Sequence, residues 1–357
     1  MKMKVNLFKN MDKTAKSNTI TYLMVIAAYV VIQLLVMTDN ISSLMEGLLV
    51  PMCVYAIAAI SLNLVVGISG ELSLGHAGFM CVGAYSSAFF SVMVGDALPE
   101  LVRFILAILI GAAVAALFGV IIGIPVLKLR GDYLAIVTLA FGEIIKNLVN
   151  VIYIGRDSNG LHFSVTDTTS LNMEADGQVL VKGALGITGT PKNASFTIGV
   201  ILILITLFII LNLINSRSGR AIMAIRDNRI AAESVGINIT KYKLMAFSIS
   251  AALAGVAGVL YAHNLSTLTV KKFDYNTSIL ILVFVVLGGI GNIRGSMIAA
   301  IILTVLPELL RGLSDYRMLI YAIVLISMML FNSAPAAINW REKVKATIKS
   351  KKMKEAK

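Results

Sequence analysis

The feature that most constrains this chain is a succession of long apolar segments between residues 19 and 332. The hydrocarbon core of a bilayer is about 30 Å thick, and an α-helix rises about 1.5 Å per residue, so about 20 apolar residues can cross it. We expect an all-α, polytopic transmembrane helix bundle of about ten spans. These are residues 19–37, 44–66, 74–94, 101–126, 133–154, 196–214, 244–263, 276–290, 296–310 and 316–332.

The eighth and ninth expected spans are short, and the glycine-rich residues 288–295 separate them. They could instead be two broken half-helices, so the number of spans lies between eight and ten. Composition supports the membrane as the main solvent, because 58% of the residues are hydrophobic and only 14% are charged. About a quarter of the residues are charged in ordinary soluble domains.

Basic residues predict how the bundle is oriented, because Lys and Arg are retained on the cytoplasmic side during insertion. With both termini cytoplasmic, most of the 31 Lys and Arg residues fall inside. Residues 1–18 and 341–357 are then basic cytoplasmic tails, and residues 19–340 form the membrane domain. The net charge of +12 comes from short clusters between apolar runs, which does not indicate nucleic-acid binding. The run that begins at Thr19 is too long for a cleaved signal peptide and lacks a small-residue cleavage site.

Two connections stand out by length. Residues 155–195 are polar and fall outside, where they are either a flexible surface loop or a contact with an external partner. Residues 215–243 fall inside. There Ile222, Ile225, Ala232 and Val235 can share one face of a short amphipathic helix, which Gly236 can end in the left-handed conformation.

This inner helix has two interpretations. It could rest on lipid headgroups, or it could sit in a groove on a cytosolic partner. Arg229 and Glu233 are spaced as an i, i+4 pair on it. Within the spans, small residues recur every four positions at Gly111, Ala115, Gly119 and Gly123, which predicts close helix packing.

Polar residues inside the spans form two groups. Glu143 and Lys146 share one helix face and are either a structural ion pair or part of a pathway lining. The second group surrounds a glycine-rich break and marks either a translocation pathway or a plain re-entrant turn. Its members are Asn63, Glu71, Ser73 and His76. The break at residues 67–70 also resembles residues 288–291, a weak sign of an internal repeat.

The chain carries no sign of enzyme chemistry. Its three histidines and two cysteines are widely spread, and no metal-binding or hydrolase motif occurs. A Walker A loop is also absent, so the chain cannot hydrolyse ATP by itself. We expect no bound cofactor and no metal site.

Five sequence segments together resemble one family. They are SLNLVVGISGELSLGHAGFMCVGAY at 61–85, LKLRGDYLAIVTLAFGEIIK at 127–146, SNGL at 158–161, the loop at 216–247 and VLGGIGNIRGSMIAA at 286–300. They resemble the permease subunits of bacterial branched-chain amino acid ABC transporters. The similarity is greatest to the member of the permease pair that has a long external loop.

The resemblance implies an ATPase-coupling role for the inner loop. ABC importers carry E-A-A-x-x-x-G there, and this chain has Ile230 in place of the glutamate. The residues implied are Arg220, Arg226, Asp227, Ile230, Ala231, Ala232, Glu233 and Gly236. The external loop departs more, since His162-Phe163-Ser164 stands where the family often has Gly-Ile-Pro.

The resemblance also implies partners and a location. The partners are two ATP-binding cassette subunits that hydrolyse ATP, a homologous second permease and an external solute-binding protein, all at a bacterial inner membrane. Leucine, isoleucine and valine are the expected substrates, with urea, short amides or nucleosides as alternatives. An ion-driven secondary transporter and a membrane enzyme for lipid-linked substrates are the competing classes.

Overall fold

The protein is a helical bundle with one small sheet. The computed structural model describes residues 13–38, 42–129, 131–174 and 177–310, and nine residues between 316 and 330. The expected tails at 1–18 and 341–357 fall largely or wholly outside the described residues, as does about half of the expected tenth span. The helices are α1 (Lys13–Met37), α2 (Ser43–Asn63), α3 (His76–Val94), α4 (Glu100–Val126), α5 (Asp132–Val151), α6 (Phe196–Asn215), α7 (Arg217–Asp227), α8 (Arg229–Ser234), α9 (Ile239–Ala262), α10 (Tyr275–Gly288) and α11 (Ile293–Leu309).

Seven helical segments in the described part of the chain are long and apolar enough to cross a membrane. They match the first seven expected spans to within several residues, so the polytopic helix bundle is confirmed. The count of ten is not. α10 has 14 residues and α11 has 17, which correspond to lengths of only about 21 and 26 Å. The two short helices fit the alternative of broken half-helices better than two full spans.

α2 forms the core of the bundle. Every residue from Met52 to Asn63 except Tyr55 is buried. α6, α9 and α11 pack beside α2, and α3 and α4 pack against α9 and against each other. The small residues predicted in the fourth span lie at the contact of α4 with α9. A Cβ atom at Gly119 would lie 2.6 Å from the Ala251 Cβ, and one at Gly255 would lie 2.5 Å from the Ala115 Cβ. The predicted close packing is therefore confirmed.

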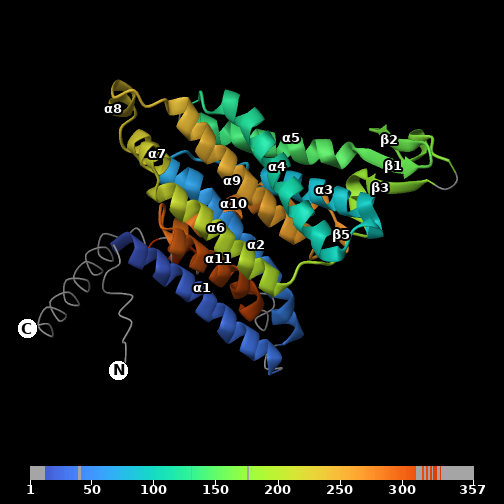
Figure 1. Cartoon of the computed structure of the whole chain (residues 1–357), viewed down its shortest axis with the longest axis horizontal. Helices are drawn as coiled ribbons and strands as arrows, with labels where there is room; N and C mark the ends of the chain where they lie inside the picture. The colour runs from blue at the N-terminus through green and yellow to red at the C-terminus, as the bar shows by residue number, and fades with distance from the viewer. Residues whose placement is uncertain are drawn as a thin grey trace, which may run out of the picture.

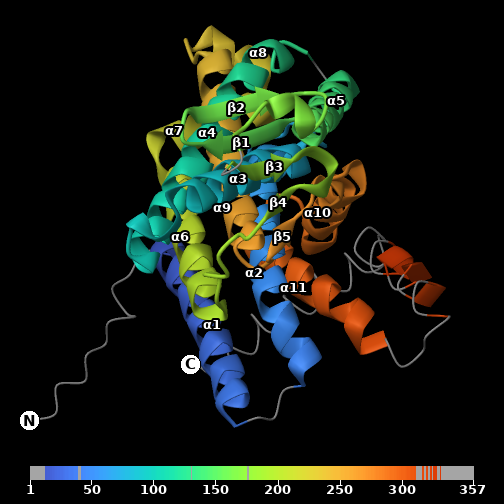
Figure 2. The ribbon, with the colours of Figure 1, turned by 90° about the vertical axis from the view of Figure 1, so that its right-hand side faces the viewer.

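The external connection supplies all but one strand of a five-stranded antiparallel sheet. The apolar pattern of the sequence does not predict this sheet. Its strands are β1 (Tyr153–Asp157), β2 (Gly160–Ser164), β3 (Gln178–Lys182), β4 (Ile187–Thr188) and β5 (Thr267–Leu268), in the order β2-β1-β3-β4-β5 (Figure 2). The last strand comes from the connection between α9 and α10. Tyr85 of α3 donates its hydroxyl hydrogen to the Leu268 carbonyl at 3.2 Å and so anchors β5 to the bundle.

The sheet and the helices α7 and α8 lie at opposite ends of the bundle (Figure 1). We call these the sheet end and the α7–α8 end. The start of α1 lies at the α7–α8 end, where Arg294 of α11 hydrogen-bonds to Ser17 and Thr21. Segments expected on opposite sides of the membrane are thus separated along the bundle.

Candidate functional site

The expected coupling helix is two helices rather than one. α7 begins at Ser216, whose Oγ accepts a hydrogen bond from Gly219 N at 3.1 Å. The chain then becomes extended at Asn228, with φ −154°, and the Asn228 side chain accepts from Ala231 N at 3.0 Å to start α8. The prediction of one continuous amphipathic helix is wrong here, because asparagine can bond the next backbone amides and begin a new helix.

Gly236 ends α8 as predicted. Its φ is +82°, in the left-handed region that favours glycine. Gly236 N donates to Glu233 O at 3.0 Å, and Ile237 N donates to Ala232 O at 3.1 Å. These two bonds form a Schellman motif, which turns the chain back toward α9.

The break at Asn228 also changes which side chains are buried. Of the four residues predicted to share one helical face, Ile222, Ile225 and Ala232 are buried, and Ile225 and Ala232 pack with Ile239 in a small apolar cluster. Val235 is 74% exposed, so the prediction that it shares a face with the other three is wrong. Ile230, at the position where importers carry glutamate, is 81% exposed. α8 therefore presents two apolar side chains to its surroundings.

The charged residues of the loop differ in what they contact. Arg220 donates to Asn215 O at 3.1 Å, a local bond at the end of α6. Arg226 binds Asp227 Oδ1 through Nε and Nη2, and its Nη1 donates to Gly67 O at 2.8 Å. Arg229 and Glu233, although correctly spaced, form no ion pair among the described residues. Ala231 and Glu233 are exposed.

Arg226 contacts the predicted glycine-rich break. Beyond Asn63 the helix widens into a π-helical turn, residues Leu64–Ser69, and Gly70 ends it with φ +75°. Such turns are rare and occur often at functional sites. The buried Asn63 side chain accepts from Gly291 N at 2.9 Å and donates to Ser296 Oγ at 2.8 Å. The two glycine-rich segments that resemble one another in sequence are therefore in contact.

Glu71 is tied to the start of α9. It forms an ion pair with Lys243, and the two side chains are only 12% and 11% exposed. Sequence reasoning missed this partner, because the two residues are 172 positions apart and no spacing rule relates them. Lys243 of α9 and Arg226 of α7 therefore contact successive parts of the same break.

The remaining two members of the break group are enclosed. Ser61 Oγ donates to Ala58 O at 2.9 Å, so His76 Nε2 is the donor in its 2.7 Å bond to Ser61 Oγ. Ser73 Oγ is buried and has no hydrogen-bond partner among the described residues. The neighbouring Leu74 N donates to Thr138 Oγ1 of α5 at 3.0 Å. A pathway role for His76 and Ser73 stays a prediction.

Glu143 and Lys146 form the predicted ion pair, with 2.5 Å between Lys146 Nζ and Glu143 Oε2. The other Glu143 oxygen accepts from Tyr275 N at 3.1 Å, at the start of α10. The pair therefore fixes the beginning of a short helix, an arrangement that spacing alone does not reveal.

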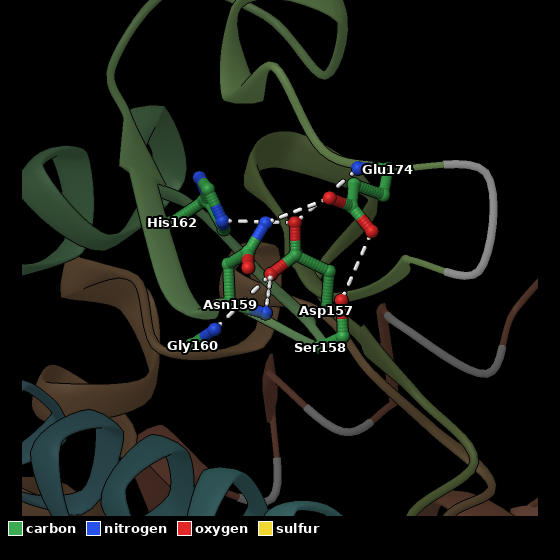
Figure 3. A network of polar contacts seen from close by, with 6 residues as sticks. All are labelled: Asp157, Ser158, Asn159, Gly160, His162 and Glu174. Carbon is green, nitrogen blue, oxygen red and sulfur yellow. Dashed lines mark hydrogen bonds and ion pairs between the residues drawn. The ribbon is translucent and has the colours of Figure 1, made fainter.

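A separate polar network lies at the sheet end (Figure 3). Asp157, whose side chain is fully buried, accepts from the backbone N–H groups of Asn159, Gly160 and Glu174, and it pairs with His162 Nε2 at 2.9 Å. Glu174 in turn accepts from Ser158 Oγ and Asn159 Nδ2. Burial raises the pKa of Asp157, but the backbone bonds from Glu174 and Asn159 and the His162 contact outweigh it, and the pKa lies below its usual value.

Sequence reasoning missed this network, although Asp157-Ser158-Asn159-Gly160 is a strong turn signal. In the ranges that the structure describes, no group of three or more His, Cys, Asp or Glu side chains is arranged to hold a metal ion, and this includes the glycine-rich break and the Asp157 network.

Comparisons with known proteins identify similar chains. Residues 44–331 match the family described as branched-chain amino acid transport system / permease component. The chain is 35% identical over 288 residues to the high-affinity branched-chain amino acid transport system permease protein LivM of Salmonella typhimurium. This match covers 78% of the chain and 66% of that relative, so the match spans slightly less than two thirds of the relative's length.

Two more distant relatives are also permeases by name. The ribose import permease protein RbsC of Escherichia coli is 27% identical, over 76% of this chain and 80% of the relative. The high-affinity branched-chain amino acid transport system permease protein LivH of Salmonella typhimurium is 27% identical, over 71% and 81% respectively. No solved structure matches the chain.

Proposed function

Because the chain belongs to the family of branched-chain amino acid transport system permease components, we propose that it is the membrane-spanning subunit of an ATP-driven importer of leucine, isoleucine and valine. It is a multi-pass protein of a bacterial inner membrane, with seven candidate spans among the described helices. In this role the chain forms a translocation pathway and performs no reaction of its own. The ATP is hydrolysed by partner subunits.

The observation that supports ATP coupling is α8. Ile230 and Val235 are 81% and 74% exposed at a helix that projects from the bundle (Figure 1). Exposed apolar side chains on a short helix are suited to a groove on a partner protein. The basic residues of the loop support a cytoplasmic position for this end, and hence for the start of α1, which lies at the same end.

The substrate proposal depends on the named relatives. LivM and LivH are each named for a high-affinity branched-chain amino acid system, whereas RbsC is named for ribose. The identity to LivM exceeds that to RbsC, which favours amino acids over sugars. We assign substrate selection mainly to an external solute-binding protein that docks at the sheet end.

The assembly we propose contains this chain, a homologous second permease and two ATP-binding cassette subunits. That two related permease proteins carry the name of one transport system, as LivM and LivH do, supports a pair of unlike permeases. The sheet end and the α7–α8 end then contact different soluble partners.

The test is uptake of radiolabelled leucine into proteoliposomes that contain the purified complex. Uptake should require ATP on the α7–α8 side and leucine-loaded binding protein on the sheet side. Uptake driven by a proton or sodium gradient without ATP would overturn the proposal in favour of a secondary transporter. ATP-dependent uptake of urea, short amides or nucleosides but not leucine would contradict the substrate assignment alone.

A further inference from the structure

The π-helical break of α2 leaves backbone carbonyl groups to be satisfied from outside the helix. The last carbonyls of any helix lack intrahelical partners, and Gly67 lies in the final turn before Gly70. Arg226 Nη1 donates to the Gly67 carbonyl at 2.8 Å. A charged donor of α7 therefore satisfies a carbonyl at the point where the α2 hydrogen-bond pattern is interrupted.

The Arg226 side chain fits closely against the break. A Cβ atom at Gly70 would lie 2.6 Å from Arg226 Cγ, so the aliphatic part of the arginine packs on that glycine. Asp227 binds both Nε and Nη2, which leaves Nη1 directed to Gly67. Among the described side chains of α7 and α8, Arg226 alone donates a hydrogen bond to the break.

The same glycine contacts the turn between α10 and α11 on its other side. A Cβ atom at Gly67 would overlap Asn63 Oδ1 and Gly291 N. Asn63 in turn bonds both Gly291 N and Ser296 Oγ, and the Asn63 and Ser296 side chains are fully buried. Arg226, Gly67, Asn63 and Gly291 thus form one continuous path from α7 to the broken helices.

The path from Arg226 to Gly291 is expected to change between discrete arrangements rather than to bend continuously. Buried polar groups that lose their partners are costly, so a shift of the break must exchange one set of bonds for another. Packed interiors respond to small displacements by changing between discrete arrangements. Glu71 and Lys243 hold the same segment to α9, so among the described side chains Arg226 supplies the hydrogen bond that joins this segment to α7.

We propose that Arg226 is a positioning residue for transport, which passes movement of α7 and α8 through the Gly67 carbonyl to the α10–α11 turn. The proposal rests on the proposed function, since it requires ATPase subunits that move α7 and α8. It assigns to Arg226 a role inside the permease that is separate from docking the ATPase.

The experiment measures leucine transported per ATP hydrolysed by the full complex in proteoliposomes with leucine-loaded binding protein. For Arg226→Gln the ATPase subunits should co-purify and hydrolyse ATP, while the ratio falls at least fivefold, within the range of about 5–150-fold found for coupling between sites. Arg226→Lys keeps a donor and should lie between Arg226→Gln and the wild type. Lys128→Gln, which removes an exposed positive charge at the same end, should keep the wild-type ratio.

A second variant changes the other side of the contact, at Gly70. Gly70→Ala places a Cβ atom against Arg226 Cγ and also strains the end of the break at φ +75°, so it should lower the same ratio. The proposal would be overturned if Arg226→Gln kept the wild-type ratio of leucine transported per ATP hydrolysed. Equal losses of uptake and hydrolysis give this result, because a purely structural residue lowers uptake and hydrolysis together. If Arg226→Gln fails to assemble, the ratio measured for Arg226→Lys and Gly70→Ala decides. A wild-type complex without ATP-driven leucine uptake would overturn the proposed function itself.

Discussion

The two ends of the bundle organise their polar side chains in opposite ways. At the sheet end, the Asp157 network closes on itself within residues 157–174, so its bonds shape one hairpin and the following turn (Figure 3). At the α7–α8 end, Arg226 bonds a carbonyl 159 positions away, and Asn63 continues the contact to Gly291. The first arrangement stabilises a surface locally. The second links a surface helix to the interior.

The largest effect should come from filling the space at Gly67. Gly67→Val would overlap Asn63 and Gly291, and overpacking of a closed interior costs about 1–3 kcal/mol, with this site at the upper end. Thermal melting of the purified protein measures it. Gly47→Ala is the control, because nothing lies within 4 Å of a Cβ atom there. Equal melting temperatures for the two variants would show that the break is loosely packed.

Removing the Asn63 side-chain amide should have the next largest effect. Asn63→Leu keeps the branched shape but removes the acceptor for Gly291 N and the donor to Ser296 Oγ, which keeps only its bond to Asn292 O, and the loss costs about 1–3 kcal/mol. Denaturant or thermal unfolding of the purified chain measures the loss. Asn215→Ala removes only an exposed bond to Leu211 O and should change stability by less than about 0.5 kcal/mol. Unchanged stability in Asn63→Leu would show that the contact between the two glycine-rich segments contributes little to the free energy of unfolding.

The ion pairs of Glu71 and Glu143 should differ in importance. Glu71→Gln leaves Lys243 without a counter-charge at a site where both side chains are nearly buried, whereas Glu143 and Lys146 are 28% and 21% exposed. Glu143→Gln also keeps an oxygen to accept from Tyr275 N. We expect the smaller loss, below about 1 kcal/mol, for Glu143→Gln. A larger loss of stability in Glu143→Gln than in Glu71→Gln would contradict this order.

The smallest and most local effect concerns the sheet. The folded-state pKa of Asp157 lies below the ordinary 3.8, so its contribution to stability is present above pH 3.8 and is lost as the pH falls through the folded-state pKa. The protection of β1 and β2 amides against hydrogen exchange, relative to the intrinsic rate at each pH, should decrease at low pH in the wild type and depend less on pH in Asp157→Asn. Exchange in α7 and α8 is the internal control. A parallel change there would mean that the two ends are not independent.

Sequence reasoning recovered the features that depend on local patterns. Apolar length predicted the seven spans, the recurring small residues predicted close packing, which α4 makes with α9, and Gly236 predicted the end of α8. The same reasoning failed where two local options compete. Asn228 can either continue a helix or cap a new one, and its choice turned Val235 outward.

The remaining features depend on residues that are distant in the chain. No pattern near Glu71 indicates Lys243, and nothing near Arg226 indicates the Gly67 carbonyl. The sheet was missed for a related reason, since β5 belongs to a different connection from the other four strands. The short strands β4 and β5 have two residues each, too few for a period to be recognised.

The most direct test of the account is whether α8 docks the ATPase subunits. Ile230→Lys combined with Val235→Lys places charge on two exposed side chains, so the melting temperature of the purified chain and its association with the second permease should stay at wild-type values. Co-purification of the ATPase subunits with the tagged complex is the measurement. We predict that the double variant loses them. Full retention of the ATPase subunits would contradict the assignment of α7 and α8 as the coupling site.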